Sequence, residues 1–295
     1  MTCFWTIIAI LFLCFIGRPI LNSPLFFDGG MDPNAQDLKQ IFAPPSAQNW
    51  LGMDHLGRDL LARILSGGEI SLLVALIATI ITVIIGLIYG SLAGYFGNKV
   101  DTILMRIVDG LLAMPFLVIV ILFKEAIETD LIKVLDFLIN EWGWSQDAVM
   151  RYGNIVPLVV AITALGWLNT ARIVRTQAAH LAQQEFVLAA KCLGLSHIRI
   201  ICKYIIPNLL GPIIVYSTLM IPGFILTESA LSFIGLGIEP PNSSWGTLIK
   251  EGANYLEVQP QILIYPAIFF SITLLSFNFL GDGLRDAVDH KSRDN

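Results

Sequence analysis

Apolar residues fall into six long runs, and the segments between them hold most of the charged side chains. A helix needs about 20 apolar residues to cross the hydrocarbon core of a membrane, and most of these runs approach that length. Because the runs are continuous rather than alternating, they exclude a transmembrane β-barrel. The pattern predicts an all-α membrane protein with about six transmembrane helices. These are Cys3–Ile16, Ile70–Phe96, Ile107–Phe123, Ile155–Thr170, Leu209–Ile234 and Ile262–Leu280.

Composition agrees with a membrane protein. Of the 295 residues 55% are hydrophobic and 14% charged, whereas soluble domains carry about a quarter charged residues. The net charge of −5 disfavours nucleic acid as a partner. The first run could be a signal peptide, but it has no basic n-region and no small-x-small cleavage site. We therefore expect a retained helix there.

The distribution of Lys and Arg predicts the orientation, with both termini in the cytoplasm (N-in/C-in). The inside segments are then 97–106, 171–204 and 281–295, and the outside segments are 17–69, 124–154 and 235–261. The inside segments carry ten Lys and Arg, and the outside segments, almost twice as long in sum, carry eight. An apolar stripe at helical spacing in 124–154 predicts a helix on the outer face, against lipid or a partner.

The sequence of segment 171–208 predicts two helices joined by a tight turn. Its first part is rich in Ala, Leu and Gln, which favour helices. Gly194 is typical of a helix C-terminus and Ser196 of the next N-cap. Pro207 predicts a break before the fifth transmembrane helix. We expect apolar Ile198, Ile200, Ile201 and Ile205 to hold the segment on the membrane's inner face.

This segment resembles the EAA loop of ABC-transporter permeases of the binding-protein-dependent importer type. Ala189 and Ala190 precede Gly194 by five and four positions, and Pro207 follows it by thirteen, as in that loop. Leu188 replaces the acid that usually precedes the alanines. Glu185 resembles the acid that the dipeptide/oligopeptide/nickel branch carries instead.

Further segments resemble the C-type permease subunit of that branch. They are Leu51–Asp59, Asp101–Pro115, Thr227–Gly237 with the following Pro240-Pro241 and Ser244–Gly246, and Asn278–Asp286. The chain would then divide into three parts: a first helix with an external segment (1–69), a permease domain (70–289) containing the EAA loop 171–208, and a tail (290–295).

The resemblance implies a type I ABC importer permease in a bacterial cytoplasmic (inner) membrane, which imports oligopeptides or dipeptides. Nickel and antimicrobial peptides are alternative substrates. The implied partners are a B-type permease subunit, two ATP-binding subunits, an extracytoplasmic substrate-binding protein and membrane lipid. No cofactor is expected in this chain, because ATP and Mg belong to the ATPase subunits. The residues implied to couple to the ATPases are Glu185, Ala189, Ala190, Gly194 and Pro207.

A few charged residues invite separate predictions. Glu228, near the outer end of the fifth helix, could border the substrate path, cap backbone groups around Pro222 and Gly223, or lie at an interface. Asp109 lies three residues after Arg106, which predicts a local ion pair at the mouth of the third helix. Arg58 and Asp59 are expected to brace the external segment.

Other classes of protein find little support in the sequence. It has no G-x-x-x-x-G-K-[ST] loop, so it is not expected to bind ATP by that route or to be an enzyme. The four His and four Cys lack metal-ligand spacing and predict neither a zinc site nor a disulfide framework. An ion-gradient-driven secondary transporter remains an alternative, although the inverted repeats of that class are not evident.

Overall fold

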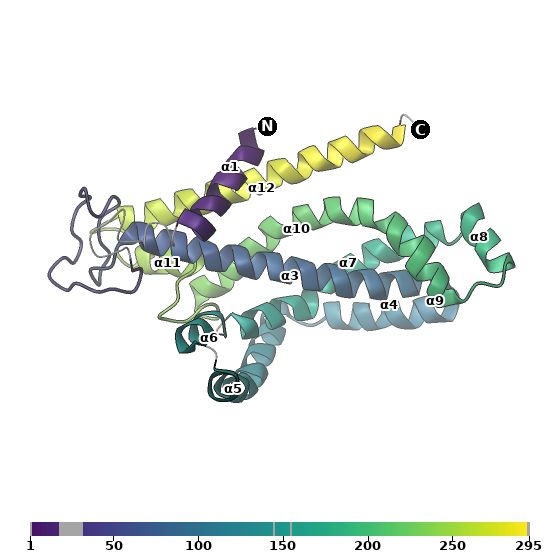
Figure 1. Cartoon of the computed structure of the whole chain (residues 1–295), viewed down its shortest axis with the longest axis horizontal. Coiled ribbons are helices and arrows are strands. Elements are labelled where there is room, and N and C mark those ends of the chain that lie inside the picture. Colours follow the sequence, from purple (N-terminus) through teal and green to yellow (C-terminus); the bar gives the residue numbers. More distant parts are fainter. Residues whose placement is uncertain (1, 18–31, 144, 154, 294–295) are drawn as a thin grey trace. The chain divides into compact units, whose positions relative to one another are not determined.

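The computed structural model describes residues 2–17, 32–143, 145–153 and 155–293, whose regular structure is helical (Figure 1). In chain order the α-helices are α1 (Thr2–Phe12), α3 (Leu60–Phe96), α4 (Asn98–Leu112), α5 (Phe116–Trp142), α6 (Gln146–Gly153), α7 (Val156–Leu181), α8 (Glu185–Cys192), α9 (His197–Ile200), α10 (Ile206–Ile234), α11 (Trp245–Ala253) and α12 (Gln261–Arg293). Two π-helical stretches, η1 (Leu13–Gly17) and η2 (Ile201–Ile205), follow α1 and α9.

In the described part of the chain, four helical segments are long and apolar enough to cross a membrane. They are Leu60–Phe96, Val156–Leu181, His197–Ile234 and Gln261–Asp286. They confirm the second, fourth, fifth and sixth predicted transmembrane helices. The first run also forms a helix, but its apolar stretch, Phe4–Phe15, is shorter than a full span. Thr6 on α1 shares a 2.9 Å hydrogen bond with Ser276 on α12.

The third predicted span, Ile107–Phe123, is wrong as a single straight helix. Helix α4 ends at Leu112, α5 begins at Phe116, and the two axes differ by 91°. Pro115 lacks the N–H that would continue α4, and its ring disfavours the helical conformation of the residue before it. Its carbonyl instead accepts the first hydrogen bonds of α5, from Val118 and Ile119. The two helices together can form one bent span, the fifth.

Segment 124–154 is helical, as its apolar stripe predicts. Helix α5 runs on to Trp142, and α6 follows at Gln146–Gly153. A Cβ built at Gly153 would lie 2.6 Å from Cδ1 of Leu135, so the glycine lets α6 pack closely on α5. The predicted stripe comprises Ile127, Leu131, Leu135 and Leu138, and the side chain of Leu138 lies outside the described part.

The chain forms two compact units. The first comprises residues 1–75, 133–158 and 221–280, and the second comprises residues 76–132, 159–220 and 281–295. All three segments predicted to be inside the cell belong to the second unit. The outside segments 17–69 and 235–261 belong to the first, as does 124–154 from residue 133 onward. This grouping agrees with the sidedness that the charges predict.

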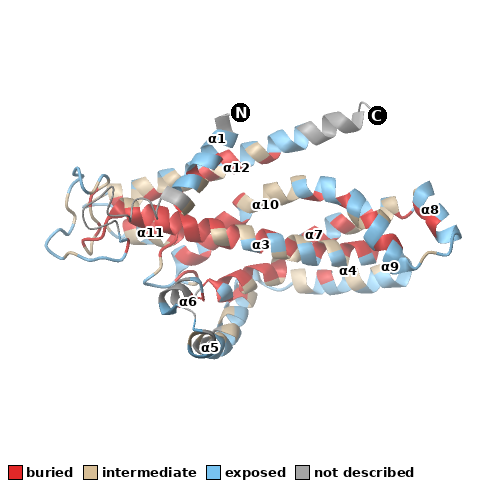
Figure 2. Ribbon diagram, in the orientation of Figure 1, coloured by how far each residue is buried: buried red, intermediate tan, exposed pale blue. Residues whose placement is uncertain are grey.

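The first unit is built around Trp245 at the start of α11. Its side chain is fully buried, and its indole Nε1 donates to the Ile64 carbonyl of α3 over 3.1 Å. A Cβ at Gly68 would lie 2.6 Å from the indole ring, so glycine gives the ring its space. Ser244 caps α11 in a capping box with Thr247. Figure 2 shows buried residues concentrated in α11 and the first turns of α3.

The second unit contains a close packing of α3 on α7. Gly86, Gly90 and Gly94 follow one another at intervals of four residues along one face of α3. A Cβ at Gly90 would lie 2.5 Å from the Ala171 carbonyl oxygen, and one at Gly86 would lie 2.6 Å from Thr170. Small residues at this spacing let the two helix backbones approach directly.

Candidate functional site

Helix α8 has one buried face, and an exposed apolar side chain lies on each flank of that face. Val187 and Ala190 are buried in a hydrophobic cluster of the second unit. The cluster also contains Tyr95, Val174, Ala178, Ala182, Ile200, Ile201, Ile205, Leu209 and Ile213. Phe186 is 40% and Leu188 47% exposed, and because they are two positions apart they point to different sides of the helix. Glu185 and Ala189 are exposed too, so the two alanines of the predicted coupling set point to different sides of α8.

Gly194 forms the turn after α8, as the sequence predicts. Its φ is +76°, in the left-handed region that favours glycine. Its N–H donates to the Lys191 carbonyl over 3.0 Å, and the Leu195 N–H donates to the Ala190 carbonyl over 3.2 Å. This pair of bonds is a Schellman motif. A Cβ at Gly194 would meet no atom within 4 Å, so the backbone angle alone requires glycine.

The break predicted at Pro207 is wrong. Helix α9, η2 and α10 form one helical path, His197–Ile234, and Pro207 lies within it. The π-helical turn η2 directly precedes α10, and such a wider turn accommodates a residue that cannot complete the α-helical bonding. The Asn208 side-chain amide donates to the Tyr204 carbonyl over 2.6 Å. Ser196 takes the N-cap position of α9, but without a side-chain cap hydrogen bond.

The isoleucines after Gly194 do not form one membrane-facing set. Ile200, Ile201 and Ile205 are buried in the hydrophobic cluster around α8, whereas Ile198 is 75% exposed. Their α-helical and π-helical spacing turns three of them toward the protein. The expectation that they hold the segment on the membrane is therefore wrong for these three residues, which stabilise the second unit instead.

Glu228 is fully buried in the first unit and is bound by serine hydroxyls. Its Oε2 accepts from Ser71 on α3 over 2.7 Å and from Ser229 over 3.2 Å, and its Oε1 accepts from Ser232 over 2.6 Å. The structure thus favours a structural role for Glu228, which was one of the predicted alternatives, although its partners are serine hydroxyls and not the backbone around Pro222 and Gly223. The contact with Ser232 could have been predicted from the sequence, since Ser232 lies one helical turn after Glu228.

Asp109 does not pair with Arg106, so that prediction is wrong. Asp109 on α4 binds the Arg172 guanidinium of α7, while Arg106 is exposed. Asp101 lies nearer the start of α4 and binds the guanidinium of Arg175 on α7 through both of its carboxylate oxygens. For Asp109 a tertiary partner on α7 thus replaces the predicted local one. Two ion pairs therefore join α4 to α7 within the second unit.

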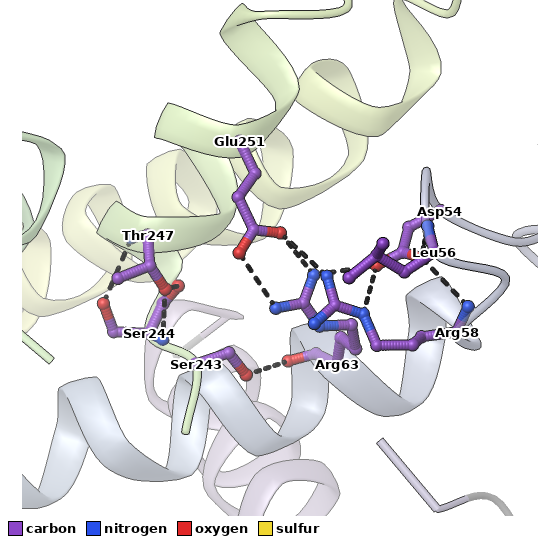
Figure 3. A network of polar contacts seen from close by, with 8 residues as sticks. All are labelled: Asp54, Leu56, Arg58, Arg63, Ser243, Ser244, Thr247 and Glu251. Carbon is purple, nitrogen blue, oxygen red and sulfur yellow. Dashed lines mark hydrogen bonds and ion pairs between the residues drawn. The ribbon is translucent and has the colours of Figure 1, made fainter. Parts of the chain in front are cut away.

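A buried charge network connects the external segment to α11 (Figure 3). Asp54 Oδ2 accepts from Arg58 Nε over 2.7 Å and from Arg63 Nη1 over 2.9 Å. Both guanidinium groups also bind Glu251. This confirms the bracing role expected for Arg58. Burial raises the pKa of Asp54, but the Arg58 N–H and the charges of Arg63 and Arg58 outweigh it and hold that pKa below its ordinary value.

Asp59 caps the start of α3. Its Oδ1 accepts from the Ala62 N–H over 2.7 Å, while its Oδ2 is buried without a partner among the described residues. Burial raises the pKa of this carboxyl. The Asp54, His55 and Glu251 ligand atoms lie within 4.8 Å of one another, as a metal site requires. Two arginines already compensate both carboxylates, so a metal cation does not fit there.

Comparisons with known proteins extend this picture. The family "Binding-protein-dependent transport system inner membrane component" matches residues 86–294. The oligopeptide transport system permease protein OppC of Haemophilus influenzae is 42% identical, over 97% of this chain and 84% of its own length. The dipeptide transport system permease protein DppC of Bacillus subtilis is 41% identical, over 88% of this chain and 73% of its own length.

A solved structure supports the fold. One chain in the structure of the methionine ABC transporter MetNI, in an inward-facing conformation, aligns with this chain at a TM-score of 0.50 and 19% sequence identity. The alignment covers 77% of this chain and 96% of the MetNI chain. The type I ABC importer permease fold and a multi-pass location in the cytoplasmic membrane are therefore established. The chain is a permease subunit of an ABC importer and belongs to the binding-protein-dependent transport system inner membrane component family, in the branch that includes OppC and DppC.

Proposed function

We propose that this permease imports oligopeptides or dipeptides. The observation that carries the substrate class is the identity of about 40% to both OppC and DppC over most of the chain. Nickel and antimicrobial peptides are the alternative substrates. The chain would form half of a membrane pathway with a B-type permease subunit and receive its substrate from an extracytoplasmic binding protein.

We further propose that α8 couples the pathway to ATP hydrolysis. ATP and Mg would bind two separate cytoplasmic subunits, and the exposed side of α8 would seat in one of them, with Phe186 and Leu188 along its two edges. Phe186 and Leu188 support this role, because exposed apolar side chains on a helix inside the cell suit a protein partner. Val187 and Ala190, on the buried face of α8, would carry the movement into the rest of the second unit.

The substrate class is tested in proteoliposomes that hold the complete transporter and its binding protein. We expect ATP-dependent uptake of a radiolabelled tripeptide and no uptake with an ion gradient alone. Uptake of Ni²⁺ without tripeptide uptake would contradict the peptide assignment. Gradient-driven uptake by the purified chain would contradict the ATP-driven mechanism.

The coupling role is tested by surface variants. Phe186→Ser with Leu188→Ser should reduce ATPase binding and transport together, because both remove apolar contact area from α8. Leu38→Ser is the matched control, since Leu38 is an exposed leucine of the external segment. At the turn, Gly194→Val should abolish transport, while Gly194→Asn should retain much of it, because Asn tolerates positive φ and Val does not. Normal transport by the α8 variants would exclude coupling through this helix.

A further inference from the structure

Tyr95, in the last turn of α3, contacts both arms of the hairpin formed by α8 and α9. Its hydroxyl shares a 2.8 Å hydrogen bond with Nδ1 of His197 on α9. The Lys191 Nζ of α8 lies 4.9 Å from the centre of its ring, in cation–π range. Lys191 and His197 stand three residues before and three residues after Gly194. One side chain therefore spans the two ends of the Gly194 turn.

The surroundings of Tyr95 fix this geometry. Its ring is buried in the hydrophobic cluster that contains Val187 and Ala190 of α8. Its two contacts, Lys191 and His197, are exposed. The His197 ring also packs edge-on against Phe96, with 5.5 Å between ring centres. A tyrosine with a buried ring and a bonded hydroxyl holds its neighbours in a defined direction.

We propose that Tyr95 is a positioning residue that makes the α8–α9 hairpin and the end of α3 move as one body. This inference rests on the proposed coupling role of α8. A glycine turn between a short helix and a four-residue helix would otherwise bend, and a push on α8 would be absorbed at Gly194. With the turn closed by Tyr95, the push reaches α3 and, through the glycine face at Gly90, α7.

We call the contacts of Tyr95 with Lys191 and His197 the clamp, and three variants separate its parts. Tyr95→Phe keeps the ring, its packing and its contact with Lys191, and removes only the hydrogen bond. His197→Ala removes the other partner of the bond, together with the ring contacts of His197. His197→Asn restores a side-chain oxygen near the position of Nδ1. The complete transporter, with its ATPase subunits and binding protein, is measured in proteoliposomes as the ratio of tripeptide imported to ATP hydrolysed.

We expect Tyr95→Phe and His197→Ala each to lower this ratio about three- to tenfold, the range that the loss of one hydrogen bond gives. The double variant should be no lower than His197→Ala, since that single variant already lacks this bond and the ring contacts of His197. His197→Asn should stay within about twofold of the wild type, by the same hydrogen-bond energetics. Co-purification of the ATPase subunits should be unchanged.

A wild-type ratio in both Tyr95→Phe and His197→Ala would overturn the clamp, even if Phe186→Ser with Leu188→Ser disrupts coupling as proposed. Loss of ATPase co-purification in these variants would also overturn it, because the bond would then serve assembly. Failure of the proposed coupling role has a different signature, since the α8 surface variants would then transport normally.

Discussion

Arg63 and Glu251 lie 188 positions apart in the sequence, yet the guanidinium of Arg63 binds both carboxylate oxygens of Glu251. Nη1 lies 2.5 Å from Oε2 and Nη2 lies 3.2 Å from Oε1. Arg63 is 3% exposed, and its Nη1 also donates to Asp54. The first turn of α3, the external segment and α11 are thus joined through one desolvated side chain, which is a bidentate partner that lysine could not replace.

Arg63→Met should destabilise the first unit by about 3 kcal/mol, the low end for breaking a buried ion pair, because Arg58 still compensates part of the charge. The thermal unfolding midpoint of the purified chain in detergent measures this effect. Arg106→Met is the control, since it removes an exposed arginine. Equal midpoints for the two variants would show that the network adds no stability.

Asp59→Asn should leave stability within about 0.5 kcal/mol of the wild type, whereas Asp59→Ala should lose about 1 kcal/mol. Asn retains a side-chain oxygen for the Ala62 N–H and removes a charge that burial disfavours. Alanine removes the cap altogether. The same unfolding measurement applies, and indistinguishable midpoints for Asn and Ala would contradict the capping role.

Gly90→Ala should destabilise the chain by about 1–3 kcal/mol, because the added methyl group would press on the Ala171 carbonyl of α7. Gly110→Ala is the matched control on α4. A Cβ there meets no atom within 4 Å, so alanine should gain stability through its helix propensity, by up to about 1 kcal/mol. A shift of the same sign in both variants would refute the close packing of α3 on α7.

Glu228→Gln should fold nearly as well as the wild type, while Glu228→Leu should lose about 1–3 kcal/mol or more. Glutamine keeps an acceptor oxygen, and the hydroxyls of Ser71 and Ser232 can rotate to accept from its amide. Leucine leaves the serine hydroxyls buried without their partner. Yield and monodispersity of the purified protein measure the difference, and a well-behaved leucine variant would contradict a packing role.

The sequence predicted what depends on local pattern. The length of the apolar runs predicted helices α3, α7, α10 and α12. Gly194 predicted a helix C-terminus, and the helix there ends in a Schellman motif. The resemblance at Ala189, Ala190 and Gly194 led to the right family. Each of these signals is contained in a few neighbouring residues or in one continuous apolar run.

What the sequence did not predict depends on tertiary partners. The pairing of Asp109 with Arg172 rather than Arg106 requires knowing that α7 lies against α4. Two differences between prediction and structure lie at prolines: Pro115, across which one span was predicted, and Pro207, where a break was predicted. At Pro115 the helix bends by 91°, while at Pro207 a π-helical turn lets it continue. The same residue type gives both outcomes, and the neighbouring backbone decides between them.

The bend between α4 and α5 constrains what surrounds the chain in the bilayer. Helix α4 has 15 residues and is therefore about 22 Å long, less than the about 30 Å thickness of the hydrocarbon core. With Asn98 at the cytoplasmic face, the turn at Ala113–Pro115 falls inside the membrane. Lipid tails cannot hydrogen-bond to a non-helical backbone, so water or another polypeptide must hydrate or cover this turn. The Ala113 and Met114 N–H groups already donate to the Asp109 and Leu111 carbonyls, so this requirement falls on the remaining backbone groups of the turn.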